Sequence, residues 1–234
     1  MRTIDKPILP DFAGVKRQSP IPAGHNGPWT EKAWALAKAL ALCSLLLSMG
    51  CASAGNTFKH EAVATLELGQ LRTTEYRQIF GEKPTATSVQ KTEDGTFEIA
   101  RYMYAHADLG TAQARCLVLE FKDGVLNSYN YVSSFSENHQ PVDLEKADQI
   151  KKGASNKNDV QQILGKPDGK ALSPSSVEDF KDRCKKGAEV WTWQAMRKVG
   201  TFAAAGGKRP EVNSIFVIFN KDGIVNEVQT ESSR

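Results

Sequence analysis

The chain has 234 residues, 40% hydrophobic and 24% charged, which is enough apolar material to bury a core and excludes a wholly disordered protein. Its net charge of +3 comes from the first 50 residues, which hold 6 basic and 3 acidic side chains, leaving 24 of each in the remainder. This balance argues against the basic surface that nucleic-acid binding requires.

The first 50 residues indicate an extension followed by an export signal. Residues 1–30 are rich in Pro and Gly without an apolar period, which predicts an unstructured segment. Lys32 and Lys38 then lead into the apolar run Ala39–Gly50. This run is shorter than the roughly 20 residues of a membrane span, so it fits a signal peptide instead.

Two processing sites compete at the end of this signal. The segment Leu47–Ser53 resembles the lipobox of bacterial lipoproteins, although Ser48 stands where Leu is usual, and it implies lipidation of Cys51. The alternative is the A-x-A site Ala52-Ser53-Ala54, which would release a soluble protein beginning at Gly55. We favour the lipidated form, in which acyl chains such as palmitate would anchor the protein stably in a membrane.

The next elements follow a plan of two helices and three strands. Helical spacing predicts helices over 58–68 and 73–80, ended by Gly69 and Gly81. Alternating apolar residues then predict strands over 96–105, 114–121 and 125–132, with a bulge near Ala100 and a turn at Asp123-Gly124.

The second half of the chain repeats this plan. Asp143 is expected to cap a helix that stops at Gly153, and Ser155 or Asn156 to cap a second helix that ends at Gly165. After a long loop over 168–187, strands are expected over 189–193, 212–219 and 224–230. The last two flank a turn at Asp222-Gly223.

A constant offset of 84 residues relates the helical parts of the two halves, pairing Gly69 with Gly153 and Gly81 with Gly165. We therefore predict an α+β fold of two tandem helix-helix-three-stranded antiparallel units, with the helices packed on one sheet face. The expected divisions are 1–50 for the extension and signal, 51–135 for the first repeat and 136–234 for the second. Whether the repeats share one sheet stays open.

The residues that carry a family resemblance are Gly153, Asp159-Val160, Leu164-Gly165-x-Pro167, Val190-Trp191-Thr192-Trp193 and the run 217–225. They resemble the SmpA/OmlA/BamE family of small outer-membrane lipoproteins. The first half fits more weakly, with Tyr76 in place of an aliphatic residue. The tandem arrangement is also similar to that of β-lactamase inhibitor proteins. The first resemblance implies a non-catalytic envelope lipoprotein, and the second implies a concave sheet that grips a protein.

Two of the four cysteines lie beyond the signal and its end. Cys116 and Cys184 could form a disulfide in an oxidising periplasm, or remain separate thiols, and the sequence leaves both readings open. No C-x-x-C pair occurs and the four histidines are scattered, so we expect neither a metal site nor a cofactor.

No pattern of catalytic residues is found, so we predict that the protein is not an enzyme. Candidate partner-binding residues are aromatic: Tyr102, Tyr104, Trp191, Trp193 and the loop residue Phe202. If the strand face that carries them lies under the helices, the strand aromatics are core instead, which is the favoured reading.

The sequence therefore predicts a periplasmic lipoprotein, anchored in the outer membrane through Cys51, that binds envelope proteins and neither nucleic acid nor a small-molecule substrate. The alternative is a secreted or periplasmic inhibitor that binds an enzyme through its sheet face.

Overall fold

A computed structural model describes residues 52–81, 83–108, 110–136 and 142–233, all within one compact unit that spans residues 49–234. The predicted extension, the apolar run and Cys51 lie outside the described residues. Within the described ranges, no helix combines the length and the apolar character needed to cross a membrane.

The strands are β1 (Ala52–Gly55), β2 (Ala86–Thr92), β3 (Gly95–Ala107), β4 (Thr111–Lys122), β5 (Val125–Ser133), β6 (Gly169–Leu172), β7 (Glu189–Met196), β8 (Val199–Gly200), β9 (Val212–Phe219) and β10 (Val225–Ser233). The α-helices are α2 (Tyr76–Phe80), α3 (Lys157–Leu164), α4 (Glu178–Lys181) and α5 (Thr201–Ala205). The 3₁₀ segments that lie wholly within the described ranges are η1 (His60–Thr65), η3 (Leu144–Gln149) and η4 (Cys184–Lys186). The helical segments are all short.

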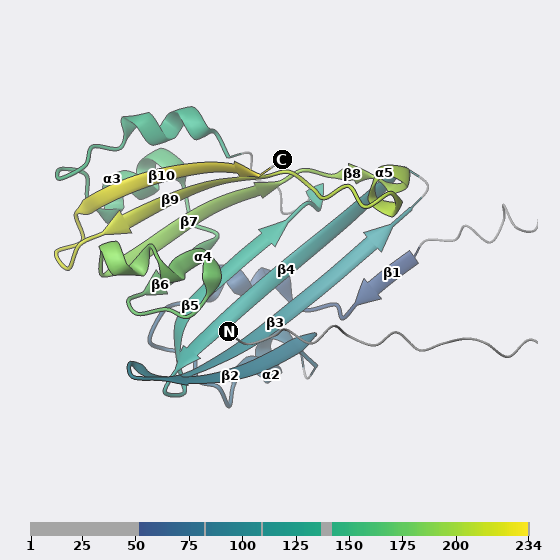
Figure 1. Ribbon diagram of the computed structural model, residues 1–234, viewed down its shortest axis with the longest axis horizontal. Coiled ribbons are helices and arrows are strands. Elements are labelled where there is room, and N and C mark those ends of the chain that lie inside the picture. The colour runs from purple at the N-terminus through teal and green to yellow at the C-terminus, as the bar shows by residue number, and fades with distance from the viewer. Residues whose placement is uncertain (1–51, 82, 109, 137–141, 234) are drawn as a thin grey trace, which may run out of the picture. The chain divides into compact units, whose positions relative to one another are not determined.

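All these strands form one antiparallel sheet in the order β1-β3-β4-β5-β6-β7-β9-β10, with β2 also paired to β3 and β8 to β4 (Figure 1). The short strand β6 joins the two halves, because Ala171 pairs with Ser128 on β5 and with Val190 on β7. The prediction of two three-stranded units is therefore wrong, and both repeats belong to one continuous sheet.

β6 lies in the segment that the sequence indicated as a long loop. Its first residue must be small, because a Cβ added at Gly169 would come within 2.7 Å of both the Tyr129 carbonyl oxygen and the Thr192 side chain. A four-residue strand is too short to show an alternating pattern, which explains why the sequence did not reveal it.

The helical segments occupy both faces of the sheet, so the prediction of helices on one face is also wrong. The helix face carries η1 and α2 in the first half and η3 and α3 in the second, over the aromatic and aliphatic side chains of two core clusters. The opposite side, here called the open face, carries α4 and η4 over a third and smaller cluster around Phe180 (Figure 1).

The two halves still share a local motif of backbone hydrogen bonds. The Gly69 N–H donates to the Leu126 carbonyl at 2.9 Å, and the Gly153 N–H donates to the Val225 carbonyl at 2.8 Å. Both glycines have positive φ, +79° and +76°, a conformation that other residues adopt with strain. The motif therefore fastens each helical segment to the returning strand of a hairpin.

A carboxylate bonds a backbone N–H three residues earlier at the start of the second helix of each half, and in α3 this bond is part of a helix cap. The Glu75 carboxylate accepts from the Arg72 N–H at 3.0 Å, and Asp159 accepts from the Asn156 N–H at 2.8 Å. The Asn156 side chain completes a capping box, which confirms it as the N-cap of α3. The predicted helix over 58–68 is reduced to the 3₁₀ segment η1.

The predicted bulge near Ala100 is absent from β3. Its pairing with β4 runs from Phe97 to Ala107 without a shift in register. Neighbouring positions are buried on alternate faces, Ile99 under α4 and Ala100 in the core of the helix face. Because this strand is covered on both sides, apolar residues are expected at its odd-numbered and its even-numbered positions alike.

Candidate functional site

Three of the four candidate strand aromatics are core residues on the helix face. Tyr102, Trp191 and Trp193 are 1%, 5% and 4% exposed. The Tyr102 hydroxyl donates to the Gly81 carbonyl at 2.7 Å, and the Trp193 indole N–H donates to the Gly165 carbonyl at 3.2 Å. A partner could not reach these rings without opening the core, so we remove them from the candidate interface.

These bonds also correct the correspondence between the halves. Tyr102 donates to the carbonyl of the glycine that ends α2, and Trp193 donates to the carbonyl of the glycine that ends α3. Tyr102 is therefore the counterpart of Trp193. The sheet register agrees, because Tyr102 pairs with Leu117 and Trp193 pairs with Ile215 at equivalent places in the two hairpins. The order of these aromatics along the sequence would instead match Tyr102 to Trp191 and Tyr104 to Trp193.

The other two aromatic candidates lie away from the core clusters. Tyr104 is half-buried, and its ring stacks on Phe135 with 5.9 Å between centroids. The Arg115 guanidinium lies 4.1 Å from the Phe135 ring centroid, which adds a cation–π contact. Phe202 lies in α5, but its side chain is outside the description, so its exposure stays a prediction.

The two cysteines are free thiols in the structure, so the candidate bridge is not present in it. Cys116 lies on β4 and Cys184 begins η4. Burial raises the pKa of both thiols, that of Cys184 to about 12. Both therefore remain protonated and weakly nucleophilic at neutral pH.

A buried carboxylate organises the covered end of the open face. Glu120 is 0% exposed, and its Oε1 accepts from Asn127 Nδ2 at 3.1 Å, Ser128 Oγ at 3.1 Å and Ser175 Oγ at 2.8 Å. Its Oε2 accepts from the backbone N–H of Ser176 at 2.6 Å and from the hydroxyl of the same residue at 2.5 Å. These donors bind the segment before α4 to strands β4 and β5.

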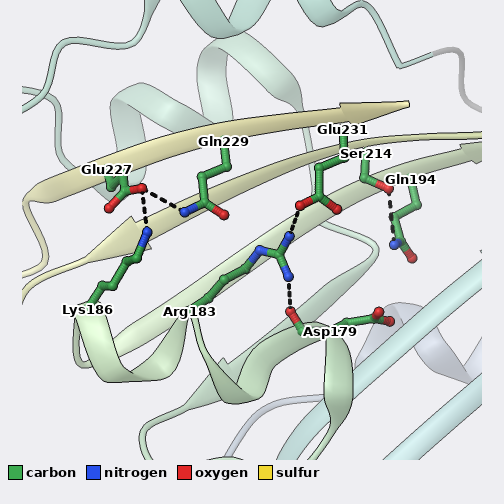
Figure 2. A network of polar contacts seen from close by, with 8 residues as sticks. All are labelled: Asp179, Arg183, Lys186, Gln194, Ser214, Glu227, Gln229 and Glu231. Carbon is green, nitrogen blue, oxygen red and sulfur yellow. Dashed lines mark hydrogen bonds and ion pairs between the residues drawn. The ribbon is translucent and has the colours of Figure 1, made fainter. Parts of the chain in front are cut away.

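A second polar network fastens the other side of this segment to the sheet edge (Figure 2). Arg183, between α4 and η4, forms an ion pair with Glu231 on β10 and lies 3.6 Å from the centroid of the Phe216 ring. Lys186 Nζ lies 2.9 Å from a Glu227 oxygen. The α4–η4 segment is therefore held to β4 and β5 at one end and to β10 at the other.

Buried acceptors lie between these two networks. Three side-chain atoms, Asn130 Oδ1, Thr192 Oγ1 and Gln194 Oε1, are buried and have no hydrogen-bond partner among the residues that the structure describes. Asn130 uses its Nδ2 to donate to Asp179 at 2.9 Å. Because buried polar groups are normally satisfied, this row is suited to bound water.

The rest of the open face contains a partly exposed group that we call the open strip: Arg101, Met103, Cys116, Val118 and Val132. Its members are neighbours across three strands, since Arg101 pairs with Val118, Met103 with Cys116, and Cys116 with Val132. Met103 is 51% exposed. Met and Arg are enriched in protein interfaces, and the flexible Met side chain adapts to irregular surfaces.

Val89 is the other strongly exposed large hydrophobic residue in the described part of the chain, at 64%. It lies on β2 opposite Glu98, which places it on the helix face, whereas Met103 points to the open face. Val89 is an isolated exposed residue on an edge strand, and single residues of this kind are ordinary. The continuous open strip is the stronger candidate surface.

The helix face contains a carboxylate with a different environment. Asp168 accepts one hydrogen bond, from the Gln194 N–H to Oδ2 at 2.8 Å. Burial raises the pKa of its carboxyl from 3.8 to about 6, against the lowering effect of this bond. It lines a cavity of about 220 Å³ together with His60, Glu61 and Lys166.

The sequence analysis does not single out Glu120, because Glu side chains lie mostly on the solvated surface of proteins. One signal was available, since this Glu lies inside the apolar run Leu117–Phe121. Its partners Ser175 and Ser176 are 55 and 56 residues away, so only the fold shows how the charge is satisfied. No group of three or more His, Cys, Asp or Glu side chains suited to a metal ion occurs in the portion that the structure covers.

Comparison with known proteins gives likenesses to solved structures alone. No protein-family model matches the chain, the SmpA/OmlA/BamE family included, and no curated protein matches it. A solved structure from Streptococcus mutans, provisionally described as a β-lactamase inhibitor protein, is 12% identical. The match covers 73% of this chain and 93% of that one, with a TM-score of 0.41.

Proposed function

We propose that this protein is a non-enzymatic, lipid-anchored module of the outer membrane that binds another envelope protein through the open strip. The observation that carries the proposal is the exposure of Met103 beside Arg101, within a continuous apolar strip on the open face. Such a surface offers an adaptable apolar contact and one cation for orientation.

Strand β1 supports the anchored form. It begins at Ala52, immediately after the proposed lipid-bearing Cys51, and its residues pair with β3 from Ala107 to Tyr104. Cleavage after Ala54 would remove three of these four paired residues, whereas cleavage before Cys51 keeps them all. The lipoprotein reading is therefore more consistent with the sheet than the A-x-A reading.

The polar groups of the open face support a structural role for two serines. A cavity of about 190 Å³ next to the Glu120 network is lined by Ser175 and Ser176. Both hydroxyls donate to the buried Glu120 carboxylate and help to satisfy its charge. We infer that these hydroxyls serve to hold the α4–η4 segment.

The anchor is tested by labelling cells with an alkyne-bearing palmitate and determining the mass of the mature N-terminus. We expect a lipidated Cys51 in the membrane fraction and loss of label in the Cys51→Ser variant. An unmodified N-terminus at Gly55 in the soluble fraction would reject the anchor and favour the inhibitor alternative.

The interface is tested by placing a photo-crosslinking amino acid at Met103 or, as a control, at Val89. We expect an adduct with an envelope protein only from position 103. Because the side chain is half exposed, Met103→Glu should reduce capture of that protein about tenfold, equivalent to about 1.4 kcal/mol, with an unchanged melting temperature. Val89→Glu should have no effect on capture.

Equal adducts from both positions would show that neither face is specific and would reject the open strip as the interface. Loss of folding in Met103→Glu would be visible as a lowered melting temperature, and Arg101→Glu then provides a second, independent variant for the same strip.

A further inference from the structure

An apolar pocket of about 270 Å³ lies on the open face beside β1. Its floor consists of alanines from β1, β3 and β4 that pair across the strands: Ala52, Ala54, Ala105, Ala107, Ala112 and Ala114. Methyl side chains at successive paired positions leave room above the sheet that larger residues would fill. Apolar cavities of roughly 150 Å³ in other proteins admit benzene, so this pocket can hold a run of methylene groups.

The connection between β7 and β9 forms the wall of the pocket. Val199 on β8 pairs with Ala112, and the Thr201 hydroxyl donates to the Asp108 carbonyl at 2.5 Å, which fixes α5 beside the floor. Met196, Val199 and Pro210 contribute apolar surface to this wall. The pocket is therefore built by two distant parts of the chain.

We propose that this pocket holds one acyl chain of the lipid on Cys51. The inference rests on the proposed function, since it needs the lipid to be attached. Its structural basis is continuity, because Ala52 lines the pocket and is the residue directly after Cys51. A chain tethered at this distance has a high effective concentration at the pocket, which a free lipid or a separate protein lacks.

The charge around the pocket agrees with a lipid occupant. Lys208 and Arg197 line it beside the apolar residues. Arg197 pairs with Glu211 at 2.9 Å, while Lys208 has no ion pair among the residues that the structure describes. A free cation at an apolar pocket suits the anionic head groups at a membrane surface, so the pocket can lie against the membrane with an acyl chain inside.

The test uses the full-length protein made in cells fed a palmitate analogue that carries an alkyne and a photoreactive diazirine. After irradiation and digestion, we expect the lipidated Cys51 peptide joined to peptides that contain residues 105–114 or 204–210. Ala105→Phe should reduce this product about tenfold by filling the pocket. Ala86→Phe is the matched control, because Ala86 is also an exposed strand alanine on the open face but lies outside the pocket.

The failures of the two proposals differ in this experiment. A labelled Cys51 whose cross-links never reach the pocket overturns the acyl site and leaves the anchor intact. An unlabelled N-terminus overturns both. The Cys51→Ser variant cannot carry the lipid. If it still gives pocket adducts with the free palmitate analogue, the pocket binds another lipid and the tethered chain is rejected as its occupant.

Discussion

Glu120 on the open face and Asp168 on the helix face are both withdrawn from water, but they differ in their hydrogen bonds. Glu120 accepts from five donors on four residues, whereas Asp168 accepts from a single backbone N–H. Burial raises the pKa of Asp168 to about 6. The cost of burying a charge therefore depends on the donors supplied to it, and the open face supplies far more.

The two faces are also stabilised by different kinds of contact. Aromatic and aliphatic side chains fill the helix face, where the Trp191 ring contacts the rings of both Trp193 and Phe219. Polar bonds around Glu120 and Arg183 fasten the α4–η4 segment to the open face. We expect the helix face to dominate overall stability and the open face to control one segment.

Trp193→Ala should have the largest effect, since the variant empties a buried site and loses the bond to Gly165. We expect a loss of about 4 kcal/mol in the free energy of unfolding, measured by urea denaturation. Tyr104→Ala, at a half-buried ring, is the control and should cost clearly less. A loss below about 1 kcal/mol for Trp193→Ala would contradict its place in the core.

Glu120→Ala should destabilise the protein by about 3 kcal/mol, because it leaves the buried hydroxyls of Ser128 and Ser175 and the Ser176 N–H without their acceptor. Hydrogen exchange should increase mainly in the α4–η4 segment. Glu93→Ala, at an exposed position, should change stability by less than about 0.5 kcal/mol. Uniform exchange over the whole sheet would show that this network is not local.

Asp168→Asn should stabilise the protein above about pH 6. Because the folded-state pKa lies above the unfolded value of 3.8, the wild type loses stability as the pH rises from about 4 to about 6, and the loss is complete above that. At about 1.4 kcal/mol per pKa unit, the raised pKa of Asp168 lowers the free energy of unfolding of the wild type by about 3 kcal/mol above about pH 6. The Asn side chain is a weaker acceptor than a carboxylate for the Gln194 N–H, which costs about 1 kcal/mol. We therefore expect a net gain of about 2 kcal/mol in the free energy of unfolding.

Denaturation of both proteins between about pH 4 and pH 8 tests this, with the exposed Asp148→Asn as control. A difference between Asp168→Asn and the wild type that stays constant over this range would show that Asp168 does not titrate between the two states.

Features fixed by a few adjacent residues could be predicted from the sequence. The Asp123-Gly124 and Asp222-Gly223 turns, the Asn156 cap and the stops at Gly81 and Gly165 follow from local backbone preferences. The buried places of Trp191 and Trp193 agree with the core reading of alternating aromatics. These signals needed no knowledge of distant contacts.

Features that depend on distant segments could not be predicted. β6 is a strand only because β5 and β7 flank it, and Gly169 looked like part of a turn. Three of the five Glu120 donors come from Ser175 and Ser176, in the stretch over 168–187 that the sequence indicated as a loop. The open strip alternates with core residues along β3 and β4, so its exposure depends on where α4 ends its cover of the sheet.

The order of strands across the sheet has a consequence for how the protein folds. From β3 to β10 neighbours in space are neighbours in sequence, apart from β8, so each strand can add to a partner that has already formed. The pairing of β8 with β4 joins Val199 to Ala112, far apart in sequence, and is expected to form late. The wall of the apolar pocket beside β1 would then form after its alanine floor, so an acyl chain already lying on the floor would be enclosed as folding ends.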